Sequence, residues 1–361
     1  MRVTLLNALR HFAGRNPRGW HPLLSVYYLT YACEFRCPYC VDGFGTPYRL
    51  KPNEVLRGEQ LNTLLGRIRA NCDHLVITGG EPIRHPDFAE FLAHLPTHRF
   101  ESAILTTSGN GLRPHLDQVA KAFSHVVFSL DTMDGEKGDR YYGREQGVHA
   151  EILATILDTA ARFKRRPRIL LSCVVTPDNL ADVPDVYAFA RAHGFRFSLS
   201  PVLRGVAPDP GLVGNPAYRA LFDRLLADKR RGVAIQGSPA YLRAMRDFAP
   251  FRCRPSTVLA VSPSGEVFYP CLEQGQPAGS LLQQPDLHAL RAHAKATLGD
   301  EPVCPNQCQS PCALGFSLLL EKPATVIEEG LTWLGSLPWR VFSAFSPRAR
   351  GGSSGDSQTG S

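Results

Sequence analysis

The stretch YACEFRCPYC, residues 31–40, holds three cysteines within ten positions: Cys33, Cys37 and Cys40. The spacing is C-x3-C-x2-C, and neither a cysteine nor a histidine follows closely enough to complete a local tetrahedral site. Thiolates select zinc or iron–sulfur clusters, and structural zinc requires four ligands. A zinc knuckle would therefore need a remote fourth ligand. Three cysteines on one loop can instead hold three irons of a [4Fe–4S] cube and leave the fourth iron open to a small molecule.

The chain has 361 residues, which predicts one large domain with additions. We interpret its net charge of +7 as an arginine-rich solvated surface, with an anionic substrate or a membrane surface as the alternative. There is no signal peptide and no apolar run long enough to span a bilayer, so we expect a cytoplasmic protein. Ten cysteines in such a chain indicate metal binding or catalysis rather than disulfides. Cys72 and Cys173 stand alone and are interpreted as small buried core residues.

Apolar strand-like runs alternate with helical patterns from about residue 23 to residue 202. Strands are predicted at 23–30, 74–78, 102–107, 125–130, 168–175 and 195–202. Helices are predicted near 57–71, 86–96, 113–123, 147–164 and 180–193. Six β-then-α units predict a parallel sheet with right-handed crossovers. The pattern alone leaves an open doubly wound sheet and a barrel as alternatives.

The remainder of the chain is less regular. Residues 203–214 are rich in proline and glycine and are predicted to form a linker or loop. Helical patterns follow at 215–231 and 238–247, and residues 257–271 predict a β-hairpin around Ser-Pro-Ser-Gly. Residues 346–361 are of low complexity and are predicted to be disordered.

The cysteine triplet after the first strand, with Tyr39 directly before the third cysteine, resembles the radical S-adenosylmethionine (radical SAM) superfamily. The resemblance implies an α/β fold, a partial (β/α)6 barrel with its site at the carboxyl ends of the strands. It implies that S-adenosylmethionine chelates the open iron and is cleaved by one electron. The resulting 5′-deoxyadenosyl radical would abstract hydrogen from a substrate. A reducing partner such as a flavodoxin or ferredoxin is then expected.

Three further stretches fit this resemblance. TGGEP (78–82) resembles the segment that binds the methionyl amino group, which places that contact on Thr78, Gly79, Gly80 and Glu81. Together with Tyr39, these residues are the expected cosubstrate contacts near the cluster.

The other two stretches lie at later strand ends. SLD (129–131) and the downstream Arg140 resemble the region that meets the ribose and carboxylate, so Ser129 and Arg140 are candidates. SCVVTPDN (172–179) resembles the fifth-strand segment, in which Val174 would touch adenine and Asn179 is a weaker candidate.

A second group of cysteines lies in the last third of the chain. Cys253 and Cys271 flank the predicted hairpin, and Cys304, Cys308 and Cys312 follow at four-residue intervals. The layout is similar to the auxiliary-cluster extensions called SPASM and twitch, although five residues rather than four follow Gly265 and a full SPASM set has more cysteines. We expect one auxiliary [4Fe–4S] cluster, with either four ligands and a spare cysteine or three ligands and an open iron. A zinc site is the alternative.

Residues 314–345 are apolar and aromatic, with Trp333, Trp339, Phe342 and Phe345. We interpret them as a helix that caps the barrel or packs on the auxiliary domain. The alternative is an interfacial helix on a membrane, because arginines follow it and the N-terminal segment is basic and amphipathic. The arginines concerned are Arg340, Arg348 and Arg350, and in the N-terminal segment Arg2, Arg10, Arg15 and Arg18.

The resemblance implies six segments. These are a basic amphipathic segment (1–22), the radical SAM partial barrel (23–205), a helical linker (206–250), a SPASM/twitch-like auxiliary-cluster domain (251–313), an apolar helix (314–345) and a disordered tail (346–361). The expected function is a radical SAM enzyme acting on a peptide, a lipid or a small metabolite. An iron–sulfur electron-transfer protein and a zinc-stabilised scaffold are the alternatives.

Some functions and roles are not supported by the sequence. The chain lacks a dense basic stripe with interleaved aromatics, so we expect no specific nucleic-acid binding. No acid or base is identified. Packing or surface positions explain the polar residues near strand ends better, namely Tyr27, Tyr28, Asp131, Tyr141 and Tyr142.

Overall fold

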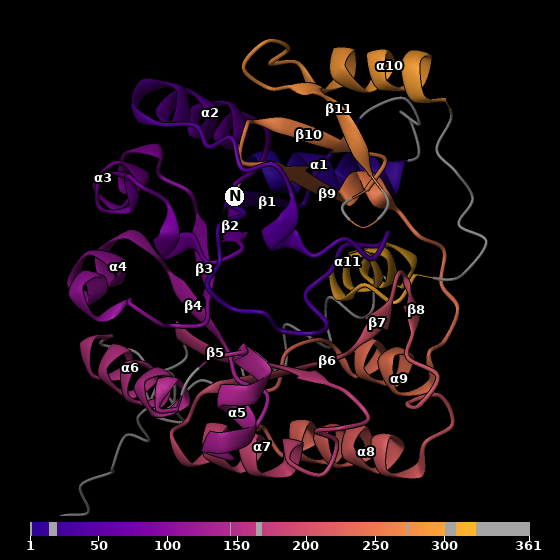
Figure 1. Ribbon diagram of the computed structural model, residues 1–361. Coiled ribbons are helices and arrows are strands. Elements are labelled where there is room, and N and C mark those ends of the chain that lie inside the picture. Colours follow the sequence, from indigo (N-terminus) through magenta and orange to yellow (C-terminus); the bar gives the residue numbers. More distant parts are fainter. Residues whose placement is uncertain are drawn as a thin grey trace, which may run out of the picture.

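The computed structural model describes residues 2–13, 20–144, 146–163, 168–271, 273, 275–299 and 308–322. Its centre is a parallel sheet of six strands whose bounds agree with the predicted ones to within a residue (Figure 1). These strands are β1 (Leu24–Thr30), β2 (His74–Gly79), β3 (Ser102–Thr107), β4 (His125–Ser129), β5 (Ile169–Val175) and β6 (Arg196–Pro201). They are neighbours in chain order, and this unbroken order distinguishes a partial barrel from a doubly wound sheet.

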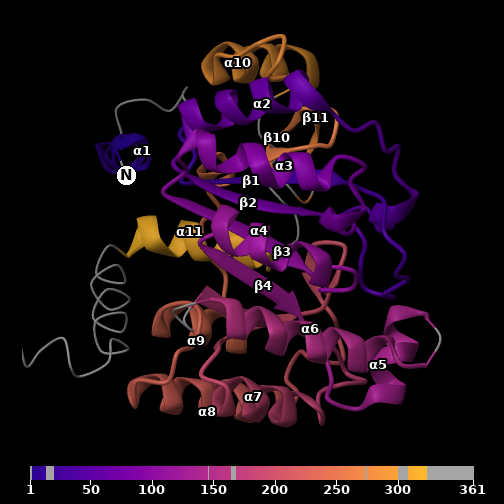
Figure 2. The same ribbon diagram turned by 90° about the vertical axis from the view of Figure 1, so that its left-hand side faces the viewer.

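Helices cover the outer side of the barrel (Figures 1 and 2). They are α2 (Gly58–Asn71), α3 (Phe88–His94), α4 (Leu116–Ala122), α6 (Val148–Arg162), α7 (Val183–Ala192) and α8 (Pro216–Arg230), whereas α5 (Gly135–Tyr142) lies at the carboxyl ends of the strands. The helices predicted at 86–96 and 113–123 are shorter than expected. Their remaining residues form 3-10 turns at Leu95–His98 and Arg113–His115, each with a proline near its start. Proline lacks the N–H that continues an α-helix, which accounts for the change.

Burial alternates along each strand of the barrel. In β5, Leu171 and Cys173 are buried against the helices, whereas Ser172 and Val174 are half-buried on the inner face. The same alternation holds along β2, β3 and β4, so one face packs on the core and the other lines the barrel interior. The prediction that Cys72 and Cys173 are buried is confirmed.

The predicted hairpin is present, and it extends the barrel sheet. It consists of β9 (Val258–Val261) and β10 (Glu266–Tyr269), and β11 (Gln276–Ser280) follows. β9 pairs in parallel with β1, with Val26 opposite Ala260, and the Leu23 amide donates to Thr257 O at 2.7 Å. The hairpin therefore covers the edge of β1 that β2 leaves open.

The region between β6 and the hairpin is mostly helical. The stretch predicted as a loop, 203–214, contains two short antiparallel strands, β7 (Leu203–Arg204) and β8 (Ala207–Pro208). The helix α9 (Pro239–Asp247) follows α8, and both begin with a capping side chain followed by proline. Asn215 accepts from the Ala217 amide at 3.0 Å and Ser238 from the Tyr241 amide at 3.1 Å.

The last described helices are α10 (Leu287–Leu298) and α11 (Pro311–Glu321). α11 lies inside the partial barrel, where Cys312 and Phe316 pack against a cluster on the inner face of β1 that includes Tyr28 and Tyr31. The predicted helix at 314–345 therefore starts earlier, and its described part is packed into the barrel. Residues 323–361 and Cys304 lie outside the described residues. Across the described ranges, no helix is both long and apolar enough to cross a membrane.

Candidate active site

The cysteine triplet lies on the loop that leaves the carboxyl end of β1. Cys33, Cys37 and Cys40 are all reduced, and the loop turns so that the Cys40 amide donates to Cys37 O at 3.1 Å. The Phe35 amide donates to Cys33 Sγ at 3.4 Å. Backbone N–H groups directed at a sulfur are typical of iron–sulfur sites, where such donors tune the cluster.

The spacing of these three thiols can be compared with what a single zinc ion and a [4Fe–4S] cluster each require. Among the described residues, no three His, Cys, Asp or Glu side chains gather closely enough to bind a single metal ion. In a [4Fe–4S] cube each thiolate binds a different iron, so its cysteines stand farther apart than the ligands of one ion. Burial raises the pKa of Cys33 to about 12, so a bound cluster would have to stabilise the thiolate. Three reduced thiols on one loop fit a cube.

The TGGEP segment holds the start of this loop through its backbone. The amides of Gly80 and Glu81 donate to Thr30 O and Ala32 O, each at 2.8 Å. A Cβ on Gly80 would lie 2.5 Å from Ala32 O, and one on Gly79 would overlap Thr30 O. The approach of β1 to β2 therefore requires glycine at both positions. Thr78 lies beside them on the inner face of β2, opposite Tyr28.

The side chain of Glu81 makes its contacts with the end of β3. Its carboxylate accepts hydrogen bonds from Thr107 Oγ1 at 2.6 Å, Ser108 Oγ at 2.6 Å and the Ser108 amide at 2.8 Å. Glu81 is buried, and this burial raises its pKa despite the three donors. The side chain ties β2 to β3, while the backbone of the same residue holds the cysteine loop.

A second acidic residue, Glu34, lies within the cysteine loop and was not predicted. Arg84 Nε donates to Glu34 Oε2 at 2.8 Å, and Asn110 Nδ2 donates to Oε1 at 2.7 Å. Burial opposes ionisation of Glu34, but the hydrogen bonds from Arg84 and Asn110 outweigh it and lower the pKa. The signal for this clamp was present in the polar run TSGN (107–110), which follows the third predicted strand as GGEP follows the second.

The opposite side of the loop is held by Asp131, at the end of the SLD segment. Tyr39 Oη donates to Asp131 Oδ2, and the Val174 amide donates to Oδ1 at 2.7 Å. Asn179 Nδ2 donates to Asp131 O at 3.1 Å and to Val174 O at 2.9 Å. Burial raises the pKa of Asp131 to about 6. Two of the sequence candidates, Tyr39 and Val174, thus meet at one buried carboxylate, and Asn179 bonds to the backbone carbonyl of the same residue.

The remaining cosubstrate candidates lie at the same end of the barrel. Ser129 is the last residue of β4, opposite Ser172, and it is half-buried on the inner face. Arg140 is exposed in the last turn of α5. The same turn brings α5 to the cysteine loop, because Tyr142 stacks on Phe35 with ring centroids 4.7 Å apart.

Four of the five later cysteines lie in the described residues: Cys253, Cys271, Cys308 and Cys312. None of them is in a disulfide. Burial raises the pKa of Cys308 to about 12, and the charges of Glu273, Cys253 and Cys271 raise it further, so these groups lie near one another. The Ser310 amide donates to Cys308 Sγ at 3.3 Å, much as Phe35 does to Cys33.

The two cysteine groups are neighbours in the fold. Directly after Cys40, the Gly43 amide donates to Glu273 O at 3.1 Å, and a Cβ on Gly43 would overlap that oxygen. Tyr48 lies beside the cysteine loop, since its amide donates to Cys40 O at 3.4 Å, and it packs against the same hydrophobic cluster as Cys312. The later cysteines therefore lie beside the cysteine loop.

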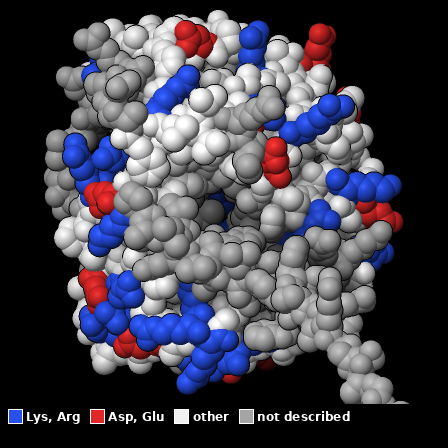
Figure 3. Space-filling view, turned by 180° about the vertical axis from the view of Figure 1, so that it is seen from behind, with Lys and Arg blue, Asp and Glu red and all other residues white. Residues whose placement is uncertain are grey.

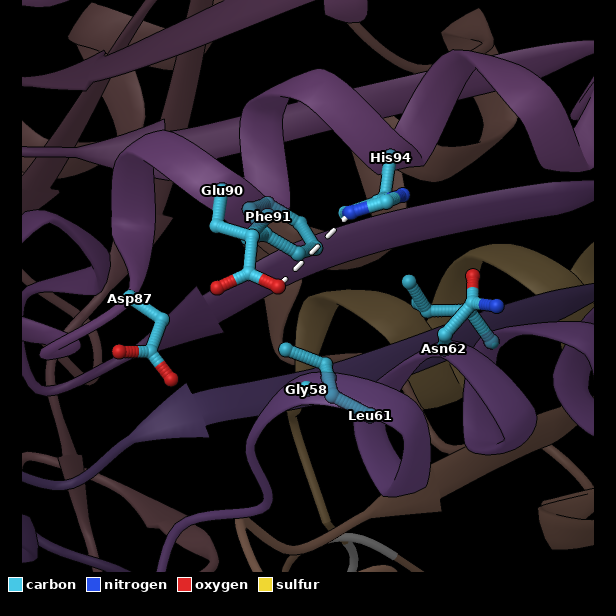
Figure 4. Close-up of a pocket in the computed structure, with 8 residues that line it drawn as sticks. Gly58, Leu61, Asn62, Asp87, Glu90, Phe91 and His94 are labelled. Carbon is cyan, nitrogen blue, oxygen red and sulfur yellow. Dashed lines mark ion pairs between the residues drawn. The ribbon is translucent and has the colours of Figure 1, made fainter.

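A small surface pocket lies away from this region, between α2 and α3 (Figure 4). Its volume of about 10 Å³ suits one water molecule, and its polar side chains are Asn62, Asp87, Glu90 and His94. Glu90 and His94 form an ion pair at 3.8 Å across one helical turn. None of the predicted site residues lines this pocket, so it has no part in the candidate site.

Comparison with known proteins finds similarity over the barrel region of the chain. Residues 27–190 match the model of the radical SAM superfamily. The GTP 3′,8-cyclase of Rhodobacter capsulatus is 35% identical over 133 residues, which cover 35% of this chain and 38% of that protein. The PqqA peptide cyclase of Xanthomonas oryzae pv. oryzae is 28% identical over 171 residues, or 47% of this chain and 44% of that protein.

Solved structures share the fold. The crystal structure of Streptococcus suis SuiB bound to S-adenosylmethionine superposes with a TM-score of 0.58 at 18% identity, covering 80% of this chain and 72% of that one. The match over residues 27–190 and these relatives therefore support a radical SAM enzyme. Similarity to this superfamily implies a [4Fe–4S] cluster and S-adenosylmethionine. The chain spans less than half the length of the two curated relatives described.

Proposed function

We propose that this chain binds a [4Fe–4S] cluster through Cys33, Cys37 and Cys40 and acts as an S-adenosylmethionine-dependent radical enzyme. When bound, the cluster and cosubstrate would supply a 5′-deoxyadenosyl radical that abstracts hydrogen from an unreactive C–H bond. The observation that carries the proposal is the loop of three reduced cysteines, clamped at the carboxyl ends of the strands, with no fourth local ligand.

The residues of the chain would bind and orient the cosubstrate. Thr78 and the backbone of Gly79, Gly80 and Glu81 would meet its amino group, at the point where TGGEP already contacts the end of β1. Tyr39 would contribute through the cysteine loop, which its hydrogen bond to Asp131 holds against β4.

The far side of the cosubstrate would meet the later strands. We propose Ser129 and Arg140 for its ribose and carboxylate, and Val174 for its adenine, with Asn179 holding the backbone beneath them. Ser129 is half-buried on the inner face and within reach of a ligand, whereas exposed Arg140 would have to fold over the mouth of the barrel.

The inner face of the barrel supports a substrate with polar groups. Ser172 lies between Ser129 and Ser198 in the sheet register, so three half-buried hydroxyls form a row across β4, β5 and β6. The opposite wall carries the rings of Tyr28, Tyr31 and Tyr48. We therefore favour a peptide or a small polar metabolite over a lipid. PqqA peptide cyclase and GTP 3′,8-cyclase are, by name, relatives of these two kinds.

We further propose that the later cysteines hold an auxiliary [4Fe–4S] cluster in a SPASM- or twitch-like region. Its place beside the first site would let it accept the electron left after hydrogen abstraction, or hold the substrate still. A flavodoxin or ferredoxin would reduce the first cluster. We also propose that the chain is divided at the six segment boundaries given above. In addition, we propose a peripheral contact with a membrane.

The test is anaerobic reconstitution of the full chain with iron and sulfide, followed by dithionite and S-adenosylmethionine. We expect 5′-deoxyadenosine, and iron near eight atoms per chain if both clusters form. Cys33→Ala should abolish 5′-deoxyadenosine formation and leave about four iron atoms. Cys72→Ala is the matched control, because Cys72 is buried at the amino end of β2, and it should leave both readouts unchanged.

The alternative functions predict other outcomes. An electron-transfer protein would take up iron but form no 5′-deoxyadenosine, and a zinc-stabilised scaffold would purify with zinc and resist exchange for iron. Formation of 5′-deoxyadenosine by the Cys33→Ala variant would show that the triplet does not hold the catalytic cluster.

A further inference from the structure

The first helix, α1 (Arg2–Ala13), presents its apolar side chains to solvent. Leu5, Leu6, Leu9 and Phe12 are exposed by 55%, 51%, 54% and 48%. A surface helix of a globular protein normally turns this face toward the core and leaves its polar face in water. Here the arrangement is reversed.

Hydrogen bonds from the opposite face hold α1 in this orientation. Asn7 is buried, and its Nδ2 donates to Pro22 O at 2.8 Å and to Asn71 O at 3.1 Å. The Thr4 amide donates to Asp73 Oδ2 at 2.9 Å, and His11 Nε2 lies 2.7 Å from His21 O. Rolling the helix to bury its leucines would break these bonds. The outward apolar face is therefore a fixed feature of the fold.

The position of α1 relative to the candidate site is also fixed. Its partners Pro22 and Asp73 directly precede β1 and β2, so α1 lies at the amino ends of the strands, whereas the cysteine loop follows the carboxyl end of β1. A strand of seven residues separates these ends by about 20 Å. Figure 2 shows α1 on the side from which the strand arrows point away.

The charged side chains that the N-terminal segment itself contributes are all basic. Residues 1–33 contain Arg2, Arg10, Arg15 and Arg18 but no aspartate or glutamate, and Glu34 is the first acidic residue of the chain. Over the described part of the rear face as a whole, blue lysine and arginine side chains predominate over red acidic ones (Figure 3). Leucine and phenylalanine beside arginine, without acidic residues, are the composition of helices that bind anionic membrane surfaces.

We propose that α1 is a membrane-docking surface that lies flat on a bilayer containing anionic lipids, with Leu5, Leu6, Leu9 and Phe12 entering the headgroup boundary. The mouth of the barrel then faces away from the bilayer, so the substrate arrives from the aqueous side. This inference rests on the membrane contact in the proposed function. It is independent of the radical chemistry, because no α1 residue contacts the candidate site.

The first experiment is sedimentation of the full chain with vesicles of equal parts phosphatidylcholine and phosphatidylglycerol, or of phosphatidylcholine alone. We expect binding to the mixed vesicles and at least tenfold weaker binding to neutral ones, on the order expected for several arginines. The Leu5→Gln/Leu9→Gln variant should bind on the order of tenfold more weakly, because two half-exposed leucines no longer enter the boundary. Equal binding to both vesicle types, or by wild type and variant, overturns the proposal.

A matched control is Leu157→Gln/Leu298→Gln, since these leucines are exposed by 40% and 41% on other helices. This variant should bind vesicles as the wild type does. Both variants should form 5′-deoxyadenosine at the wild-type rate without vesicles, so loss of binding with retained turnover separates docking from the proposed activity. Loss of binding in the control variant would overturn the assignment to α1.

The second experiment is hydroxyl-radical footprinting of the full chain with and without mixed vesicles. We expect residues 5–12 to become protected only when vesicles are present, while Phe44 and Leu50, exposed near the cysteine loop, stay reactive. Protection without vesicles would mean that another part of the chain or a second copy covers α1. Protection of Phe44 and Leu50 in place of α1 would mean that the mouth docks. Either result overturns the proposal.

Discussion

Asp131 offers the sharpest test of how the cysteine loop is held. It is buried at the end of β4 and accepts hydrogen bonds from Tyr39 Oη and from the Val174 amide, the latter at 2.7 Å. Replacement by alanine removes both acceptors, whereas asparagine keeps one oxygen for the Val174 amide and can donate its amide to Tyr39 Oη. Asp131→Ala and Asp131→Asn should therefore differ.

The expected magnitudes follow from the groups left without partners. In Asp131→Ala two buried donors lose their acceptor, which at roughly 1–3 kcal/mol each lowers the free energy of unfolding by about 3 kcal/mol. In Asp131→Asn the Val174 amide keeps its acceptor and Tyr39 Oη accepts a hydrogen bond from the new amide. A desolvated charge also disappears, so the change should stay within about 1 kcal/mol.

The pH dependence has a definite sign. Burial raises the pKa of Asp131 from 3.8 to about 6, so the folded chain binds this proton more tightly than the unfolded chain. The contribution of Asp131 to stability is then lowest above pH 6 and grows as the pH falls toward 3.8. Between pH 7 and pH 5 the wild type should gain about 1 kcal/mol that both variants lack.

The assay is urea denaturation of the iron-free chain at pH 7 and at pH 5 under reducing conditions, with unfolding monitored by tryptophan fluorescence. Iron retention after reconstitution is the functional readout, and Asp131→Ala should lose iron faster than Asp131→Asn, because Tyr39 lies between two of the cysteines. Equal stability of the two variants, or a wild type that loses stability relative to them at pH 5, would refute the reasoning.

Two further substitutions probe the glycine turn and the second cysteine group. Gly80→Ala places a methyl group 2.5 Å from Ala32 O and should lower the free energy of unfolding by about 2 kcal/mol and weaken S-adenosylmethionine binding, measured by denaturation and titration calorimetry. Its control, Gly66→Ala, meets nothing closer than 3.9 Å within α2 and should stabilise by up to about 1 kcal/mol, so equal effects would contradict the close-approach argument. Cys308→Ser should reduce reconstituted iron from about eight to about four atoms per chain without abolishing 5′-deoxyadenosine, and unchanged iron would remove Cys308 as a ligand.

Local features of the sequence were enough to predict the barrel strands and to single out the cysteine loop as a candidate site. The six apolar runs correspond to six parallel strands, because a buried strand is recognisable from its own residues and the glycines and prolines that bound it. The triplet and GGEP were likewise readable because each is a short segment whose chemistry depends on its internal spacing. Their positions at neighbouring strand ends followed from the parallel order alone.

Contacts between distant segments could not be predicted in this way. Glu81 was expected at the cosubstrate, yet its carboxylate is taken up by Thr107 and Ser108 on the next strand. Tyr39 meets Asp131 across 92 positions of sequence, and β9 returns to pair with β1 after the whole barrel has formed. Periodicity states which face of an element is apolar but does not name the partner of that face.

The N-terminal helix shows most clearly what the sequence reveals and what only the tertiary structure reveals. Its amphipathic character is set by residues 3–12 and was evident from the sequence, whereas the direction in which the apolar face points was not. Asn7 can find Pro22 O and Asn71 O only once β1 and α2 have come together, and those hydrogen bonds turn the leucines outward. The sequence by itself determined the barrel strands and the cysteine loop, because both depend on near neighbours. Only the tertiary structure decided what each surface faces, because that depends on residues brought together by folding.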